Sequence, residues 1–294
     1  MNIIHHGGDI MDEYGLVLCG GGGRGAYQIG VWRALERLGL RKYITAVSGT
    51  SVGALNAALF ASVSSKRACD IWCSISPRDI ADPAEAIGRA LGTVIGFAMS
   101  DEKKVTAEQA GRFVKSGLFS RDGIISLIED NGISRSVGSA EFPVFACCHN
   151  STLGRAEYFD MRAFSPKTVT RILTASSAIP GAFPIERIGR YSYRDGGISD
   201  NIPVKPLYDI GYRKFIISYL DGVHIDHYRF PGAEFIELFP SEAIYLGENS
   251  RSMLSNGTMD FNGANAAARI ELGEQETAAF FMLVSSSHRL LLPV

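Results

Sequence analysis

Short apolar runs alternate with stretches of helical periodicity from the start of the chain. Residues 15–19 are continuously apolar, which is typical of a strand buried on both faces. A segment of helical period follows and ends near Gly39, and a second β-branched run at 43–47 leads into an alanine-rich run at 54–60. This order of strand, helix, strand, helix predicts an α/β fold with a mostly parallel sheet.

The same patterning continues to the end of the chain without an interrupting linker. Further buried strands are predicted at 142–148, 190–194, 215–220 and 234–240. Helices are predicted at 123–129, 169–178, 201–212 and 262–272, with a terminal apolar helix at 278–284. We therefore expect one domain over 13–294, a disordered tail at 1–12, and a variable, mostly helical segment at 62–136.

Composition and charge narrow the class of partner. The 294 residues are 46% hydrophobic, and 29 Lys and Arg oppose 31 Asp and Glu for a net charge of -2. The chain therefore lacks the surplus of basic residues that is typical of proteins that bind nucleic acid. The uncharged apolar stretch 90–100 is shorter than the roughly 18 residues that suggest a spanning helix. The N-terminus has no signal-peptide pattern, and the number of cysteines, five, is odd. We therefore expect a cytoplasmic protein, either soluble or peripheral to a membrane.

The junction between the second strand and its helix carries candidate chemistry. Gly49-Thr50-Ser51-Val52-Gly53 has the G-x-S-x-G pattern of a nucleophile elbow, a sharp turn that lifts the serine hydroxyl out of the backbone. Gly49 and Gly53 would remove Cβ clashes between the crossing strand and helix. Ser51 is therefore the candidate nucleophile. The alternative is an ordinary glycine-rich turn.

The loop after the first strand, Gly20 to Gly25, has two possible functions. It matches the G-x-G-x-x-G of a nucleotide-binding oxidoreductase, but such a site also needs an acid at the end of the second strand, and residues 46–49 supply none. The amides of a glycine loop at a helix N-terminus also favour negative charge, which suits an oxyanion hole. A flexible turn without a ligand is the third possibility. Arg24 would either orient this loop or bind an anionic head group.

A base for the serine must come from later in the chain. Asp195-Gly196-Gly197 follows a strand-like run, at the place where a catalytic carboxylate would be needed, although such a sequence is often a simple turn. The competing arrangement is a Ser-Asp-His triad of the α/β-hydrolase kind with His224 or His227 as base. His149, at the end of a strand, is more typical of a structural histidine.

The glycine loop, the elbow, the run Ala175-Ser176-Ser177-Ala178-Ile179-Pro180 and Asp195-Gly196-Gly197 together resemble the patatin-like phospholipases over about residues 13 to 275. The resemblance implies a three-layer α/β/α sandwich and a Ser51–Asp195 dyad supported by Gly49, Gly53, Gly196 and Gly197. It also implies an oxyanion hole formed by Gly21, Gly22, Gly23, Arg24 and Gly25. The implied reaction is hydrolysis of lipid acyl esters, without a metal or cofactor.

Three further expectations follow from that chemistry. Asp195 should lie in a partly desolvated pocket that raises its pKa, since a carboxylate is otherwise a weak base. The substrate should be a lipid or a membrane surface. An unrestrained lipase would damage its host, so control by a partner, a small ligand or a cover at residues 84–100 is expected. A catalytically silent lipid-binding module is the remaining alternative, and labelling of Ser51 by a fluorophosphonate would distinguish the two.

Overall fold

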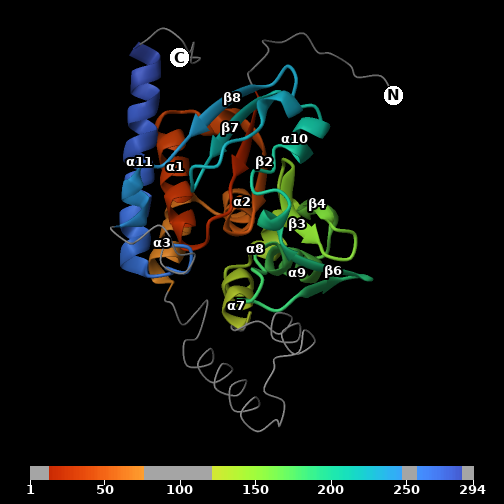
Figure 1. The fold of residues 1–294 in the computed structure, drawn as a ribbon. Helices are drawn as coiled ribbons and strands as arrows, with labels where there is room; N and C mark the ends of the chain where they lie inside the picture. The colour runs from red at the N-terminus through yellow and green to blue at the C-terminus, as the bar shows by residue number, and fades with distance from the viewer. Residues whose placement is uncertain (1–12, 76–120, 247–256, 287–294) are drawn as a thin grey trace, which may run out of the picture.

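The structure is a computed structural model that describes residues 13–75, 121–246 and 257–286 (Figure 1). The strands are β1 Tyr14–Leu18, β2 Ile44–Thr50, β3 Val144–Asn150, β4 Arg155–Asp160, β5 Glu186–Ile188, β6 Tyr191–Asp195, β7 Lys214–Ser218 and β8 Glu234–Leu238. The longer helices are α1 Ala26–Arg37, α2 Val52–Ser62, α3 Ser65–Ser74, α7 Asp122–Asp130, α9 Pro166–Ser176 and α11 Gly263–Ser286, and the short ones are α8 Ile133–Ser136 and α10 Lys205–Asp209. The tail expected at 1–12 and the cover expected at 84–100 lie outside the described residues.

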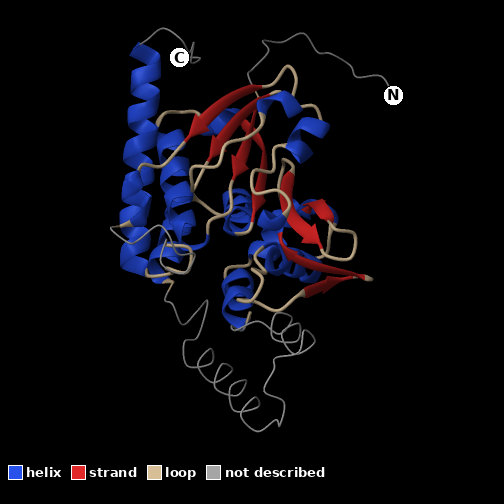
Figure 2. Ribbon diagram, viewed as in Figure 1, coloured by secondary structure: helices blue, strands red, loops and turns tan. Residues whose placement is uncertain are grey.

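One mixed sheet forms the centre of the molecule (Figure 2). Its strands follow the order β5-β6-β3-β2-β1-β7-β8, with β4 paired to β3. The run from β3 through β2, β1 and β7 to β8 is parallel, and the pairs that involve β4, β5 and β6 are antiparallel. The predicted three-layer α/β/α architecture is confirmed.

Strand β1 shows why the sheet is covered on both faces. Leu16 and Leu18 belong to the larger apolar cluster, which also contains side chains of α1, α2, α9 and α11. Val17 belongs to the smaller cluster on the opposite face, together with Leu207 of α10. Successive side chains of a strand point to opposite faces. The continuous apolar run in the sequence is therefore a strand buried on both sides.

The C-terminal region differs from the prediction. The two helices expected at 262–272 and 278–284 are a single helix, α11, which lies along α1 (Figure 1). Its buried positions recur every three or four residues, at Ala266, Ile270, Gly273, Thr277 and Phe281. This recurrence keeps one face on the core across residues 273–277. The apolar terminal run is only partly docked, because Met282 and Leu283 are 65% and 71% exposed.

The helix predicted at 201–212 is also shorter than expected. Only Lys205–Asp209 is helical, as α10. The residues before it make hydrogen bonds to the parallel strands instead: the side chain of Asn201 bonds the backbone of Gly20, and the Ser48 hydroxyl donates to the Pro203 carbonyl at 2.6 Å. These contacts hold the chain beyond β6 against the ends of β1 and β2.

Candidate active site

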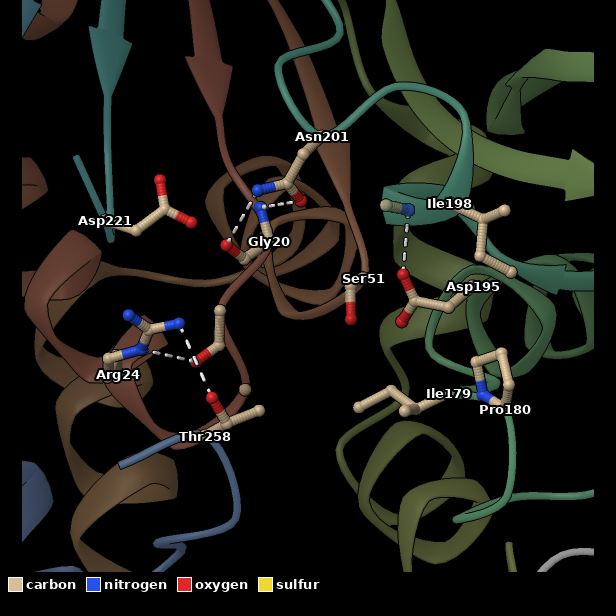
Figure 3. Close-up of a pocket in the computed structure, with 13 residues that line it drawn as sticks. Gly20, Arg24, Ser51, Ile179, Pro180, Asp195, Ile198, Asn201, Asp221 and Thr258 are labelled. Carbon is tan, nitrogen blue, oxygen red and sulfur yellow. Dashed lines mark hydrogen bonds between the residues drawn. The ribbon is translucent and has the colours of Figure 1, made fainter. Parts of the chain in front are cut away.

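A cavity of about 550 Å³ lies beyond the carboxyl ends of β1 and β2 (Figure 3). Ligands approach open α/β sheets at this edge. The cavity is lined by Gly20, Gly21, Gly22, Arg24, Ser51, Ile179, Pro180, Asp195, Gly197, Ile198, Asn201, Asp221 and Thr258. The structure therefore brings the elbow, the glycine loop and the Asp-Gly-Gly segment to one place.

Ser51 lies between β2 and α2 in a strained backbone conformation. Its φ is 56° and its ψ is -125°, and a positive φ is uncommon for residues other than glycine. A Cβ on Gly49 would lie 2.1 Å from the Gly53 carbonyl oxygen, and one on Gly53 would lie 2.1 Å from the Leu18 carbonyl oxygen. The two glycines thus allow helix, strand and turn to meet at backbone contact.

A second serine holds this strained turn in place. The Ser51 N–H donates to the Ser176 Oγ at 2.9 Å, and the Ser176 hydroxyl donates to the Cys147 carbonyl at 2.6 Å. Ser176 is fully buried at the end of α9. Its hydroxyl therefore ties the elbow to strand β3.

The register of β3 brings Asp195 beside the elbow. Cys147 pairs with Thr50 of β2, and the next residue, Cys148, pairs with Asp195 of β6. Strand β4 occupies one edge of β3, since every residue of β4 pairs with it. Strands β2 and β6 therefore both pair with the other edge of β3. Thr50 and Asp195 are therefore neighbours along that edge, and Ser51 follows Thr50 directly.

The Asp195 carboxylate is almost completely withdrawn from water. Its Oδ1 accepts a hydrogen bond from the Gly197 N–H at 2.8 Å. Its Oδ2 is buried and has no hydrogen-bond partner in the part of the chain that the structure describes. Ser51 lies beside this carboxylate in the cavity (Figure 3).

Burial raises the pKa of the Asp195 carboxyl to about 6, and the Gly197 N–H and the Ser51 hydroxyl oppose the rise only in part. The carboxyl is thus a stronger base than an exposed aspartate and has an acceptor oxygen free.

Two amides of the glycine loop are available to a ligand. The Gly23 N–H donates to the Thr258 carbonyl at 2.9 Å, and the Arg24 N–H is bonded to the Gly21 carbonyl at 3.4 Å. The N–H groups of Gly21 and Gly22 have no acceptor among residues 13–75, 121–246 and 257–286, and both residues line the cavity. Of the five loop residues expected from the sequence to form an oxyanion hole, Gly21 and Gly22 are thus the two that line the cavity with an N–H group that has no acceptor among the described residues.

The ends of this loop are fixed to the scaffold. The Gly20 N–H donates to Asn201 Oδ1 at 3.1 Å, and Asn201 Nδ2 donates to the Gly20 carbonyl at 3.3 Å. At the other end, the Gly25 carbonyl accepts from Asn56 Nδ2 at 2.9 Å. Gly25 therefore packs against α2, on the side of the loop away from the cavity lining.

Arg24 is bonded mainly to the protein itself. Its guanidinium donates to the Gly21 carbonyl at 3.2 Å, the Leu220 carbonyl at 2.7 Å and the Thr258 hydroxyl at 3.4 Å. The side chain is buried, and burial lowers its pKa. Of the two functions considered for Arg24, these contacts favour orienting the loop.

The strap, which we define as residues 257–260, braces the loop from outside. Thr258 and Asp260 present their carbonyl oxygens to Gly22 and Gly23 at distances that leave no room for a Cβ. The strap is held in turn by Arg269 of α11, which is fully buried. Arg269 forms an ion pair with the Asp260 carboxylate at 2.8 Å and donates to the Ile244 carbonyl at 3.0 Å.

A scan against protein-family models matches the patatin-like phospholipase model to residues 16–208 of this chain. The chain belongs to the patatin-like phospholipase family. The matched segment contains all four motifs that carry the sequence resemblance: the glycine loop, the elbow, the run 175–180 and the Asp195 segment. The strap and Arg269 lie beyond it.

Curated relatives of this patatin-like chain are large fungal proteins. The chain is 31% identical over 204 residues to a lysophospholipase nte1 of Aspergillus terreus and 30% identical over 204 residues to one of Aspergillus niger. In each case the match spans 67% of this chain and 11% of the relative. Among solved structures, VipD from Legionella pneumophila matches 94% of this chain and 67% of its own with a TM-score of 0.51 at 14% identity, a likeness of fold alone.

The histidines considered as alternative bases of this patatin-like protein lie away from Ser51. The His224 ring packs against the rings of Tyr219 and Phe239, and His227 Nε2 lies 3.1 Å from Glu237 Oε2. His149 Nδ1 is 2.6 Å from the Ser199 hydroxyl. Within the described chain, no histidine lines the cavity.

Several residues of the site have no motif signal in the sequence. The sequence marks Ser176 only as a member of the run 175–180 and Asn201 only as the start of a predicted helix, and it gives Thr258 and Arg269 no signal. Each contributes through a contact with a residue more than 100 positions away or with the strap. In the part of the chain that the structure describes, no group of His, Cys, Asp or Glu is placed to hold a metal ion, and no helix is both long and apolar enough to cross a bilayer.

Proposed function

We propose that this patatin-like protein hydrolyses carboxylic ester bonds of phospholipids or related lipids, with Ser51 as nucleophile and Asp195 as base. The observation that supports this most strongly is the Asp195 carboxylate, which is buried beside Ser51 with an unpartnered Oδ2 and a pKa raised to about 6. A buried carboxylate of raised pKa in a cleft is a strong indicator of a functional site. The lysophospholipase names of the fungal relatives agree with a lipid ester as substrate.

The reaction would proceed through an acyl-enzyme. Asp195 takes the Ser51 hydroxyl proton as Oγ attacks the ester carbonyl carbon, and the amides of Gly21 and Gly22 donate to the oxyanion. Collapse of the intermediate breaks the bond to the alcohol, which takes the proton from Asp195. Water then loses a proton to Asp195 as it attacks the acyl group, and the proton returns to Ser51 as the fatty acid leaves.

The test is covalent labelling combined with turnover. We expect a fluorophosphonate to label the protein, and lysophospholipid and phospholipid vesicles to be hydrolysed. Both activities should be lost in Ser51→Ala, and turnover should fall at least about 1000-fold in Asp195→Asn, the scale on which mechanism-linked residues act. His224→Ala and His227→Ala are the controls, because neither residue lines the cavity. Loss of turnover in a histidine variant would replace the dyad with a triad, and labelling that persists in Ser51→Ala would exclude Ser51 as nucleophile.

A further inference from the structure

Ser51 lies at the junction of two cavities of different character. The first is the wide cavity of about 550 Å³ described above, whose lining includes the polar side chains of Arg24, Asn201 and Asp221. The second, of about 30 Å³, shares Gly22, Ser51 and Ile179 with it. The remaining lining of this second cavity is Val52, Leu55, Ile124, Ser177, Phe183, Met259 and Phe261.

A third cavity, also of about 30 Å³, lies next to the second one along α2. It shares Val52, Leu55, Ile124 and Phe261 with the second cavity. Its other lining residues are Asn56, Leu59, Ile71, Trp72, Ile75 and Leu127. The second and third cavities, which we call the path, therefore form a row that begins beside Ser51 and extends between α2 and α7 to Trp72.

The path offers almost nothing to a polar ligand. Asn56, the polar side chain of the third cavity, donates to the Gly25 carbonyl and to Gln28 Oε1, and it accepts from Trp72 Nε1 at 3.0 Å. The Ser177 hydroxyl donates to the Leu173 carbonyl at 2.9 Å. Because these polar groups are already bonded, the free energy of binding in this path must come from apolar contact.

We propose that the second and third cavities bind the acyl chain of the substrate, and that Leu55 and Ile124 set its preferred length. This inference rests on the proposed ester hydrolysis by Ser51. The alcohol portion of the ester would occupy the wide first cavity, where the polar side chains of Arg24, Asn201 and Asp221 lie. Leu55 of α2 and Ile124 of α7 border both apolar cavities, so their side chains stand where a lengthening chain must pass.

The volumes make these two side chains decisive. A cavity volume of about 10 to 15 Å³ holds one water molecule. Each apolar cavity therefore accepts only a few atoms of a ligand unless side chains move. In a hydrophobic pocket, one methylene group changes discrimination between substrates by about tenfold or more. Truncation at the shared wall should therefore favour long chains, and enlargement there should exclude them.

The experiment measures kcat/KM for p-nitrophenyl butanoate, octanoate, dodecanoate and hexadecanoate. In Leu55→Ala and Ile124→Ala, we expect the ratio of hexadecanoate to butanoate turnover to rise about tenfold. In Leu55→Phe the ratio should fall by a similar factor. Ile128→Ala is the matched control: Ile128 is fully buried on the same helix as Ile124 but lines neither apolar cavity. It should lower thermal stability without changing the chain-length profile.

A second measurement locates the chain directly. Trp72 and Trp32 are the two tryptophans, and only Trp72 lines the path. A hexadecyl fluorophosphonate attached to Ser51 should shift the emission of Trp72, and an ethyl fluorophosphonate should not. The shift should disappear in Trp72→Phe.

The outcomes separate this inference from the proposed function. Chain-length profiles that run parallel in all variants, together with Ser51-dependent turnover, would overturn the acyl path but leave the esterase. An unchanged Trp72 emission with the long-chain label would do the same. A wild-type protein without Ser51-dependent turnover of any ester would overturn the esterase, and the acyl path with it.

Discussion

The two sides of the cavity are built in different ways. On one side, the Ser51 elbow is formed by a contiguous stretch, β2 and α2, whose glycines meet at backbone contact. On the other side, the strap holds the glycine loop that carries the amides of Gly21 and Gly22. Its Thr258 is hydrogen-bonded to Gly23 and Arg24, which lie more than 230 residues earlier in the chain. The elbow is determined locally, and the oxyanion loop is determined by the tertiary fold.

This difference predicts different responses to substitution. Damage to the elbow changes the backbone of the nucleophile itself, so activity should fail wherever the clash cannot be relieved. A substitution in the strap leaves Ser51 and Asp195 in place and makes only the N–H groups of Gly21 and Gly22 less well positioned. The first should remove activity, and the second should lower it.

The largest effect is expected from Gly53→Ala. The new Cβ would lie 2.1 Å from the Leu18 carbonyl oxygen, so β1 or α2 must shift. A displacement of about 1 Å can reduce turnover about 100-fold, and we expect at least that loss in fluorophosphonate labelling. Gly138→Ala is the control, since its Cβ would meet nothing within 4 Å. Normal labelling of Gly53→Ala would show that the elbow does not require this contact.

A smaller loss is expected from Arg269→Met on the loop side. We expect kcat to fall about tenfold with little change in KM, which is less than the roughly 100-fold loss that deletion of an oxyanion donor causes. Folding stability should fall too, because Asp260 loses its buried partner. The double variant Arg269→Met/Asp260→Asn should recover stability but not kcat.

The control is Arg33→Met, which removes another arginine that pairs with an acid, here between α1 and α11. Arg33 is 44% exposed in its ion pair with Glu274. Its removal should change neither kcat nor stability much, as is usual for exposed ion pairs. If Arg269→Met lost stability but kept its kcat, the strap would be structural only.

This contrast also explains what the sequence could predict. The order of strands and helices, the elbow, the glycine loop and the Asp195 segment are encoded in short stretches, so hydrophobic periodicity and turn chemistry indicate them. The bracing of the loop by Thr258 and of the strap by Arg269 depends on which distant residues the fold brings together. The same reason accounts for α11, where the sequence predicts two helices, 262–272 and 278–284, although one buried face continues between them.

A few-fold fall in the rate of fluorophosphonate labelling is expected from Ser176→Ala. Ser176 lies between the two sides of the cavity. The substitution would leave the buried Ser51 N–H and the Cys147 carbonyl without their shared partner. An unsatisfied buried group costs about 1 to 3 kcal/mol, so urea unfolding should detect the loss, and the labelling rate should fall a few-fold. Thr170→Ala is the control, because the Thr170 hydroxyl donates to the Pro166 carbonyl of the same helix and the residue lines none of the three cavities. Equal labelling rates in the two variants would show that Ser176 does not position the elbow.

The last prediction concerns pH and has opposite signs for activity and stability. Asp195 must be ionised to act as base, so kcat/KM should fall as the pH drops through about 6, the pKa to which burial raises this carboxyl. In the unfolded chain the pKa of an aspartate is about 3.9. The folded state therefore favours the protonated form, and the stability that this preference supplies is present at low pH and is lost as the pH rises through about 6. Since one pKa unit corresponds to about 1.4 kcal/mol, Asp195→Asn should be more stable than the wild type at pH 8 by on the order of 2 kcal/mol, and by little near pH 4. Urea unfolding at both pH values measures the difference. A variant that is no more stable at the higher pH would mean that the Asp195 carboxylate is solvated in the folded protein, and the base proposed for Ser51 would lose its main physical support.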